Sequence, residues 1–280
     1  MVGSGSVECY RLAPLMRPYL KSGLIIFTGA FWLVSWVFVA ILFFWSQRIR
    51  SALRGFIYTH WCKTILFICR TRVHVEGSVG EEPCLLLSNH MSSVDIPLLG
   101  SQANAVFVAK REIGSWPLIG WAVTGIGTIY IDRKNRHQVA LINRKTREAF
   151  AKGYWITIFP EGGITPADKI YPLKSSLLEP FVPEDIPIRY ATIRYETGPK
   201  DLPVDESVAW WGVGMWEHLK RLFSCRRIDG YLTIREYTGP REDRKALALG
   251  LEEVMSADFQ PARSSAEVDV DEKPTPVELA

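Results

Sequence analysis

An uninterrupted apolar run near the amino terminus sets the first limit on how this chain can fold. Residues 23–44, GLIIFTGAFWLVSWVFVAILFF, contain no charged side chain. About 20 apolar residues are what a helix needs to cross the hydrocarbon core of a bilayer. A cleaved secretory signal has a shorter apolar region followed by small residues, whereas this run continues into Trp45, Ser46, Gln47 and Arg48. The sequence therefore predicts a membrane helix over residues 23–44.

Basic residues flank this run on both sides, with a slight excess after it. By the positive-inside rule, that excess favours a cytoplasmic location for the rest of the chain. We therefore expect a protein of the inner or plasma membrane, with the domain that follows the helix on the cytoplasmic side. The basic residues before the run are Arg11, Arg17 and Lys21, and those after it are Arg48, Arg50, Arg54 and Lys63.

The segment that follows leaves two alternatives open. Residues 51–69, SALRGFIYTHWCKTILFIC, mix apolar and aromatic side chains with Arg54, His60 and Lys63. Such a pattern predicts either an amphipathic interfacial helix, which would form the second arm of a hairpin in one leaflet, or a helix buried in the folded domain. In both cases we assign residues 1–70 to an amino-terminal membrane-anchoring segment.

Composition excludes several classes of protein and of site. A formal net charge of +3, without a basic stripe interleaved with aromatics, gives no indication of nucleic-acid binding. Ten tryptophans are typical of a protein that meets lipid. The cysteines form no CxxC pair and have no metal-ligand spacing with histidine, so we expect reduced thiols and no metal site. They are Cys9, Cys62, Cys69, Cys84 and Cys225.

Residues 71–256 alternate strand-like and helix-like patterns. This alternation predicts an α/β domain with a largely parallel central sheet flanked by helices. The acidic segment 257–280 carries proline and serine, and we expect it to be disordered. The predicted strands cover 72–76, 84–88, 105–109, 128–131, 155–159, 186–195 and 231–237. The predicted helices cover 93–100, 110–123, 135–152, 175–181, 208–223 and 241–255.

The segment 85–99, LLLSNHMSSVDIPLL, places His90 directly after a buried strand and Asp95 five residues later. Inside one regular helix the two side chains would diverge by about 140°. They converge if His90 lies in the loop and Asp95 in the first turn of the next helix, where Asp95 could fix the tautomer and leave a ring nitrogen as a base. Residues 92–95 also fit a capping box with aspartate for glutamate. Spacing alone therefore leaves a catalytic pair and a helix cap as alternatives.

Three other stretches follow predicted strands. Residues 127–133, GTIYIDR, place Arg133 at a helix start, which suits an anion or is simply a solvated helix end. Residues 159–163, FPEGG, hold Glu161 on a stiff turn, where it could bind a basic side chain or a substrate hydroxyl unless the turn is an ordinary surface one. Lys174 precedes the predicted helix 175–181 and is either an anion contact or a surface lysine. No nucleophile elbow, Walker loop or dinucleotide motif is present.

Together these motifs resemble the PlsC-like lysophospholipid acyltransferases, the 1-acylglycerol-3-phosphate O-acyltransferase family. Asn89, His90 and Asp95 match the family motif Asn-His-x-x-x-x-Asp. Residues 127–133 match Gly-x-Ile-Phe-Ile-x-Arg with tyrosine for phenylalanine, and residues 159–162 match Phe-Pro-Glu-Gly. The resemblance covers about residues 71–193 and implies the glycerolipid acyltransferase fold.

The resemblance also implies a mechanism. His90 would be the general base, oriented by Asp95, and would take a proton from an acceptor hydroxyl as it attacks an acyl thioester. The thioester of coenzyme A or acyl carrier protein would be a co-substrate, no cofactor is expected, and the acceptor would be a lipid of the bilayer. The substrate-binding residues implied are Asn89, Lys110, Arg133, Glu161, Gly162, Gly163 and Lys174.

One departure from the family bears on the acceptor. Gly163, Ile164 and Thr165 stand where the family has Thr-Arg-Ser, so one bidentate phosphate donor is missing. Residues 172–176, PLKSS, resemble a Pro-Phe-Lys-Ser-Ser stretch of acyltransferases, some of which act on lyso-ornithine lipid. We expect 1-acyl-sn-glycerol-3-phosphate as the acceptor, giving phosphatidic acid, with lyso-ornithine lipid as the alternative. A non-catalytic lipid-binding membrane protein is the third hypothesis.

Overall fold

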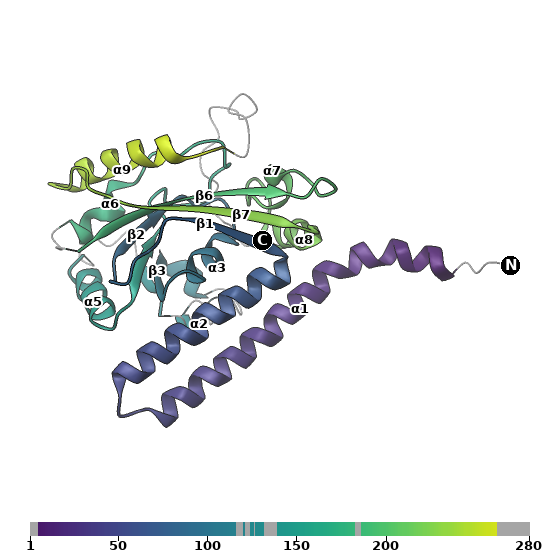
Figure 1. The fold of residues 1–280 in the computed structure, drawn as a ribbon, viewed down its shortest axis with the longest axis horizontal. Coiled ribbons are helices and arrows are strands. Elements are labelled where there is room, and N and C mark those ends of the chain that lie inside the picture. The colour runs from purple at the N-terminus through teal and green to yellow at the C-terminus, as the bar shows by residue number, and fades with distance from the viewer. Residues whose placement is uncertain are drawn as a thin grey trace.

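A helical hairpin and an α/β domain make up the computed structural model of this protein (Figure 1). The structure describes residues 5–115, 120, 124–125, 127–131, 139–182 and 186–261. The hairpin is formed by α1 (Gly5–Leu42) and α2 (Gln47–Cys69), which lie side by side. The predicted membrane helix is confirmed as helical, but it begins at Gly5 rather than at residue 23 and ends at Leu42.

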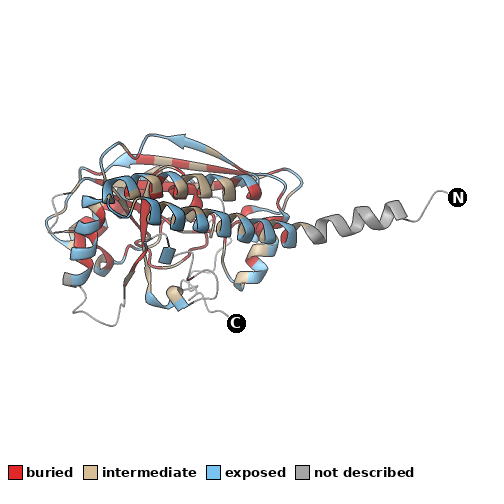
Figure 2. Ribbon diagram, turned by 90° about the horizontal axis from the view of Figure 1, so that it is seen from below, coloured by how far each residue is buried: buried red, intermediate tan, exposed pale blue. Residues whose placement is uncertain are grey.

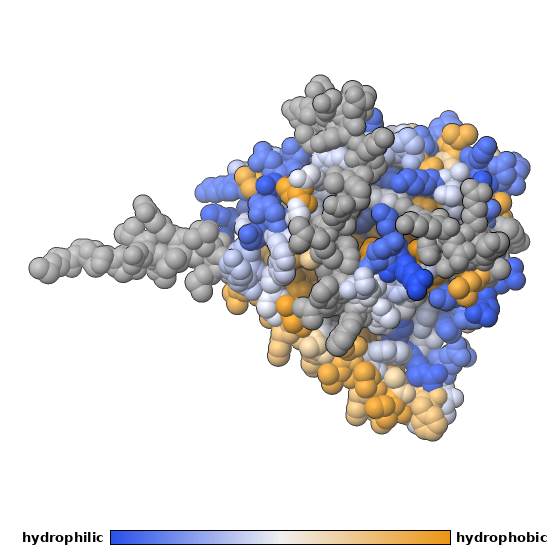
Figure 3. Space-filling model, turned by 180° about the vertical axis from the view of Figure 1, so that it is seen from behind, coloured by the Kyte–Doolittle hydropathy of each residue, from blue (hydrophilic) through white to orange (hydrophobic). Residues whose placement is uncertain are grey.

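The outer face of α1 is apolar and uncovered. Residues 17–42 form the one described helix that is long and apolar enough to cross a bilayer, and none of its most apolar window is buried. Phe27 and Phe38 are 71% and 61% exposed, and Trp45, between the two helices, is 67% exposed. Figure 2 shows this face as a continuous exposed strip, and Figure 3 shows the apolar side chains gathered along the hairpin. Such a surface suits lipid rather than water.

The second helix of the hairpin belongs to the folded domain on one face. Arg54 is buried and donates hydrogen bonds to Oδ1 of Asn104 and to the carbonyl of Ala105, just before and at the start of a strand. Its guanidinium also lies 4.3 Å from the ring centroid of Tyr154. The opposite face of α2 exposes Phe67 at 82%. Thus α2 combines both alternatives left open by the sequence, a domain helix on one face and an exposed aromatic surface on the other.

One sheet of seven strands crosses the α/β domain in the order β1-β7-β6-β2-β5-β3-β4. The strands β2 to β6 are mutually parallel, β7 is antiparallel to β6, and the edge strand β1 is parallel to β7. The predicted, largely parallel sheet is therefore confirmed. The strands are β1 (Thr71–Glu76), β2 (Leu85–Ser88), β3 (Ala105–Lys110), β4 (Ile129–Ile131), β5 (Trp155–Ile158), β6 (Ile188–Thr197) and β7 (Ile228–Glu236).

Helices cover both faces because the central strands are apolar on both. In β2, Leu86 packs into a cluster with residues of α2 and of α3 (Asp95–Gly100), whereas Leu85 and Leu87 pack with α5 (Val139–Ala151) and α9 (Arg244–Asp258). All three leucines are fully buried. Successive side chains of a strand point to opposite faces, so a continuous apolar run marks a strand covered on both sides. This burial fixes β2, and with it the segment that begins at His90.

Two predicted helices are wrong. Instead of a helix over 110–123, Lys110 ends β3 and a short 3-10 helix, η1 (Arg111–Ser115), follows; most of residues 116–123 lie outside the described residues. Instead of a helix over 208–223, the chain forms α7 (Val204–Ser207), a loop, and α8 (Met215–Ser224). Gly212 in that loop has φ +68°, a conformation that breaks a helix and favours glycine.

The remaining helices differ from prediction only at their ends. The predicted helix 175–181 is split into α6 (Ser175–Leu178) and a 3-10 turn, η3 (Glu179–Phe181). The helix α9 begins after Asp243, whose carboxylate accepts hydrogen bonds from the backbone N–H groups of Lys245 and Ala246. It continues to Asp258, two residues into the segment expected to be disordered, and residues 262–280 of that segment lie outside the described residues.

Candidate active site

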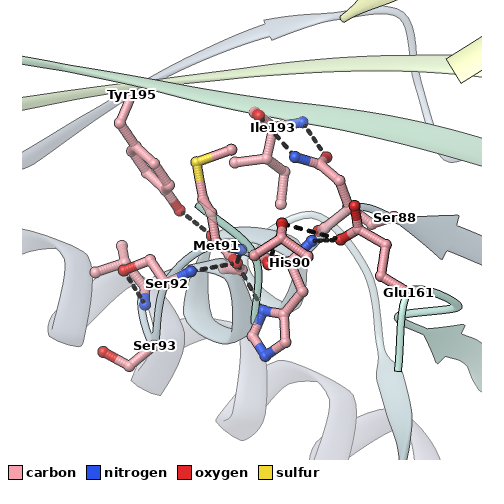
Figure 4. Close-up of polar contacts among 12 residues, drawn as sticks. Ser88, His90, Met91, Ser92, Ser93, Glu161, Ile193 and Tyr195 are labelled. Atoms are coloured by element: carbon pink, nitrogen blue, oxygen red, sulfur yellow. Dashed lines mark hydrogen bonds and ion pairs between the residues drawn. The ribbon is translucent and has the colours of Figure 1, made fainter. Parts of the chain in front are cut away.

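His90 and Asp95 form a hydrogen-bonded pair at the carboxyl end of β2. Oδ2 of Asp95 lies 2.7 Å from Nδ1 of His90 (Figure 4). Asp95 is completely buried in the first turn of α3, whereas the His90 side chain in the preceding loop is 15% exposed. The predicted convergence of loop and helix is therefore observed. A carboxylate on Nδ1 holds that nitrogen as the N–H tautomer and leaves Nε2 as the basic nitrogen.

Four groups hold the carboxylate of Asp95 in place. Besides His90, the backbone N–H groups of Met91 and Ser92 donate to Oδ2 at 2.8 and 2.9 Å. The hydroxyl of Tyr195 on β6 donates to Oδ1 at 2.7 Å. A buried carboxylate is stable only when hydrogen bonds replace the water that it has lost. Asp95 thus has partners on both oxygens, and it cannot turn away from His90 without breaking them.

The helix-cap alternative is realised only in half, beside the pair of His90 and Asp95. The bond from Ser92 N–H to Asp95 is the half of a capping box in which the later residue reaches back. The other half is absent, because the hydroxyl of Ser92 accepts from Val94 N–H, at 3.3 Å, and Val94 is the residue that precedes the helix. One carboxylate therefore both caps the turn and orients the histidine.

Glu161 stabilises the loop that carries His90. It is 1% exposed, and its Oε2 accepts from the backbone N–H of His90 at 2.8 Å while its Oε1 accepts from that of Tyr171 at 3.0 Å. Thr165 adds a hydroxyl to Oε2 at 3.4 Å and donates its own N–H to the carbonyl of His90. Burial raises the pKa of Glu161 to about 8, although the backbone hydrogen bonds from Tyr171 and His90 act in the opposite direction. Both oxygens bond to backbone N–H groups, which gives Glu161 a positioning role in the loop, and its contact with a head group stays a prediction.

Asn89 has a similar role on the other side of the loop. Its Nδ2 donates to the carbonyl of Ile193 at 3.0 Å and its Oδ1 accepts from the N–H of the same residue at 2.7 Å. The amide thus forms two bonds to the backbone of β6, and the residue is 2% exposed. Asn89 thus fixes the end of β2 against β6, and its contact with substrate stays a prediction.

The ring of His90 is also held by an aromatic neighbour. It stacks on Phe159 with centroids 3.9 Å apart and planes 13° apart. Phe159 directly follows β5, so the first residue of the motif 159–162 sets the plane in which the imidazole lies. The bond to Asp95 and the stack together leave Nε2 directed away from Asp95 (Figure 4).

The other predicted residues gather at the same edge only in part. Gly162, at φ +79°, is buried next to Glu161, and Gly163 is half-buried. Lys110 ends β3, and the exposed Lys174 precedes α6, with its N–H bonded to the carbonyl of Pro160. Arg133 lies outside the described residues. Within the described parts of the chain, no three histidine, cysteine, aspartate or glutamate side chains are placed to hold a metal.

Tyr195 is a residue of the candidate site that the sequence analysis did not identify. It lies in a strand expected from its apolar pattern, and its tyrosine side chain gives no local sign of a polar role. Its hydroxyl is buried against a carboxylate 100 residues earlier in the chain. Only the pairing of β6 with β2 brings the two together. A buried tyrosine usually finds a partner for its hydroxyl, but the sequence does not say which one.

Comparison with known proteins agrees with this geometry. Residues 70–192 match the family model described as Acyltransferase. A lyso-ornithine lipid O-acyltransferase of Pseudomonas aeruginosa is 29% identical over 187 residues, which are 66% of this chain and 71% of that protein. A 1-acyl-sn-glycerol-3-phosphate acyltransferase of Neisseria gonorrhoeae is 28% identical over 62% of this chain and 68% of its own length.

The fold is also similar to that of a solved structure. The crystal structure of the 1-acyl-sn-glycerophosphate acyltransferase PlsC from Thermotoga maritima has a TM-score of 0.63 to this chain. That comparison covers 90% of this chain and 95% of the other at 20% identity. The hairpin, the sheet order and the site at the carboxyl end of β2 accordingly belong to one fold. Residues 70–192 therefore form a PlsC-like acyltransferase domain, and the chain is an acyltransferase.

Proposed function

We propose that this enzyme transfers a fatty acyl group from an acyl thioester to the free hydroxyl of a lysolipid, with His90 as general base. The buried and four-fold bonded carboxylate of Asp95, 2.7 Å from Nδ1 of His90, is the observation that carries the proposal. A carboxylate held so firmly can stabilise the imidazolium that forms when Nε2 accepts a proton. No described serine or cysteine needs to form an acyl-enzyme in this scheme.

The reaction then needs one addition and one elimination. Nε2 of His90 takes the proton of the acceptor hydroxyl as its oxygen attacks the thioester carbon. The tetrahedral intermediate collapses, the carbon–sulfur bond breaks, and the thiolate receives the proton from His90. An ester and a free thiol result, and His90 returns to its neutral form. General base catalysis of this kind contributes about 10²- to 10⁴-fold to rate.

The hairpin supports a reaction at the surface of a bilayer. A lysolipid acceptor has an acyl chain that remains in the membrane, so its hydroxyl meets His90 only if the domain is held there. The apolar face of α1 between residues 17 and 42, together with the exposed Phe67 of α2, supplies the lipid contact. We propose that this face is embedded in the inner or plasma membrane, with the catalytic domain on the cytoplasmic side. Coenzyme A or acyl carrier protein would deliver the acyl chain from that side.

The first acceptor that we propose is 1-acyl-sn-glycerol-3-phosphate, with phosphatidic acid as the product. The three motifs support it, as does the similarity to the acyltransferase of Neisseria gonorrhoeae that is named for this substrate. Lys110 is the last residue of β3, and Lys174 directly precedes α6. Both lysines supply positive charge near this edge of the sheet. With Arg133 they are the candidate partners of a phosphate group.

Lyso-ornithine lipid is the second acceptor that we propose, and the loop that begins with the motif 159–162 favours it. Ile164, which replaces the arginine of the family, is buried, and Thr165 is bonded to His90 and Glu161. Asp168 on the same loop is 5% exposed, and its Oδ1 has no hydrogen-bond partner among the described residues. An ornithine head group carries an ammonium, to which a carboxylate is complementary. The similarity to the Pseudomonas aeruginosa enzyme points the same way.

An acceptor screen tests the proposal and separates the two acceptors. Purified wild-type enzyme and the variant Asp168→Asn would be given a long-chain acyl-CoA with lysophosphatidic acid, lyso-ornithine lipid or a neutral lysolipid. Product formation from any lysolipid by the wild type supports acyl transfer. A rise in KM for lyso-ornithine lipid alone in Asp168→Asn supports the ornithine acceptor, and no product from any acceptor, with acyl-ACP tried as well, contradicts the proposal.

A further inference from the structure

A second histidine lies beside the catalytic segment. His218 of α8 is completely buried, and its Nε2 lies 2.8 Å from the hydroxyl of Ser93, which is one of the four residues between His90 and Asp95. Its ring stacks on Trp210 with centroids 5.0 Å apart and planes 3° apart. The backbone N–H of Trp210 donates a hydrogen bond to the carbonyl of Met91 at 2.8 Å. The chain after β6 thus contacts the segment 91–93 through both His218 and Trp210.

His218 cannot act as a base for Ser93. Burial, and to a lesser extent Arg221 and His90, lower the pKa of His218 to about 3, so the ring is neutral at pH 7. An imidazole with so acidic a conjugate acid is a poor acceptor for the proton of a hydroxyl. His90 has the buried carboxylate of Asp95 as its partner, whereas His218 has only a hydroxyl. The two histidines therefore have different roles, set by their surroundings.

The surroundings also assign the tautomer of His218. Its Nδ1 is buried and has no hydrogen-bond partner in the described parts of the chain. A buried N–H without a partner is rarer in proteins than a buried acceptor without one. We therefore assign the hydrogen to Nε2, which then donates it to the oxygen of Ser93. In that arrangement the hydrogen of the Ser93 hydroxyl remains available for another acceptor.

Ser93 is placed to use that hydrogen. Its side chain is half-buried, unlike the buried Ser92 before it, and it belongs to the same short segment as His90. Figure 4 shows Ser93 and the imidazole of His90 on the same side of the segment, away from β6. A substrate oxygen bonded to Nε2 of His90 would therefore lie on the side of the segment that carries Ser93. Preorganised hydroxyl donors at such a position stabilise negative charge that develops on a substrate oxygen.

We propose that Ser93 contacts the substrate beside His90 and donates its hydroxyl hydrogen to a substrate oxygen, with His218 as the residue that positions it. The inference rests on the proposed acyl transfer at His90. The substrate oxygen belongs either to the thioester carbonyl, which becomes negative in the tetrahedral intermediate, or to the lysolipid acceptor. Because His218 donates to the oxygen of Ser93, it holds the hydroxyl in one direction without itself meeting substrate.

Kinetics of single and double variants test the inference, with an acyl-CoA and whichever of lysophosphatidic acid and lyso-ornithine lipid the wild type uses. Ser93→Ala should lower kcat/KM about tenfold or more, whereas Ser93→Thr, which keeps the hydroxyl, should stay within a few-fold of wild type. His218→Gln keeps an N–H donor and should resemble wild type, while His218→Leu should resemble Ser93→Ala. The double variant Ser93→Ala/His218→Leu should be little worse than either single variant.

The pattern of the loss identifies the contact. A fall in kcat alone supports the thioester carbonyl, and a rise in the KM of the acceptor supports the lysolipid oxygen. Ser207→Ala is the matched control, since this buried serine of α7 donates to the carbonyls of Leu202 and Pro203, is hydrogen-bonded to the thiol of Cys225, and should leave kcat/KM unchanged. Wild-type kinetics in Ser93→Ala overturn the inference while acyl transfer stands. A loss that Ser93→Thr does not restore, or that follows a fall in Tm, shows a structural role and also overturns it. Inactivity of the wild type toward both lysolipids would instead reject the proposed function.

Discussion

The hydroxyl of Tyr195 donates a hydrogen bond of 2.7 Å to Oδ1 of Asp95, the oxygen that His90 does not use. Both residues are buried, one on β6 and the other in the first turn of α3. The orientation of the Asp95 carboxylate therefore depends on a strand far along the chain. Residues that hold such a partner matter for rate because a small displacement of the base reduces proton transfer.

Removal of that hydroxyl should reduce rate more than it reduces binding. We expect Tyr195→Phe to lower kcat about tenfold, with little change in the KM of either substrate, and to cost about 1–2 kcal/mol of folding free energy because Asp95 loses a buried donor. Tyr190→Phe is the control, since Tyr190 on the same strand donates to Asp258 at 2.8 Å, away from His90. Steady-state kinetics with thermal unfolding make the comparison. Equal kcat values for the two variants would show that Tyr195 does not act on the site.

The buried carboxyl of Glu161 should make the folded protein less stable as the pH rises from 4.5 to about 8. Burial raises its pKa to about 8 from an ordinary value of 4.5. Between those two values the folded state binds more protons than the unfolded state, so this group's contribution to stability is full below pH 4.5 and decreases until about pH 8. Glu161→Gln does not titrate, so the difference in Tm between wild type and variant should change over this window in favour of the variant as pH rises. A constant difference from pH 5 to 8 would contradict the assignment.

His218 should have the opposite effect on the acid side. Its pKa is lowered from 6.5 to about 3, mainly by burial, so the unfolded state binds more protons between those values. Its contribution to stability is full above pH 6.5 and decreases as pH falls toward 3. The variant His218→Gln has no such titrating group. Its Tm should therefore rise relative to that of the wild type as the pH falls from 6.5 to 4.5. His74→Gln, on a half-exposed histidine of β1, is the control. A difference in Tm that does not change with pH would show that His218 is accessible to water.

The buried guanidinium of Arg54 should hold the hairpin against the domain. Its hydrogen bonds to Asn104 and Ala105 and its contact with Tyr154 join α2 to the start of β3. Arg54→Met should lower the free energy of unfolding in detergent by about 2–3 kcal/mol, because hydrogen bonds from a charged group are lost. The exposed Arg144, whose ion pair with Glu148 spans 3.8 Å, is the control, and Arg144→Met should change little. Equal effects would mean that Arg54 contributes no more than a surface residue.

The sequence predicted the parts of this fold that depend on local patterns. The alternating strands and helices indicated the parallel sheet, and the apolar run in 85–87 marked a strand buried on both faces. The spacing of His90 and Asp95 allowed their convergence, which the structure shows. The helix over 208–223 was wrong because its apolar spacing concealed the break at Gly212.

Contacts between distant segments could not be predicted. Glu161 and Asn89 were expected to meet substrate, since their motif positions indicated function but not which atoms they bond. Only the folded chain shows that their polar atoms bond to the backbone of His90, Tyr171 and Ile193. The contacts of Tyr195 and His218 could not be predicted for the same reason. Each contact joins residues more than 90 positions apart, which only strand pairing or helix packing brings together.

The catalytic role of His90 is the central claim, and the rate of acyl transfer by purified His90→Ala tests it most directly. The variant would be compared with the wild type at saturating acyl-CoA and at saturating concentration of the lysolipid that the wild type acylates, with thermal unfolding to confirm that it is folded. His90 is partly exposed, and Asp95 keeps its hydrogen bonds from Met91, Ser92 and Tyr195 when the imidazole is removed, so the variant should still fold. We predict a loss of about 10³-fold or more in kcat with a Tm close to that of the wild type. Acyl transfer within a few-fold of the wild-type rate would contradict the account.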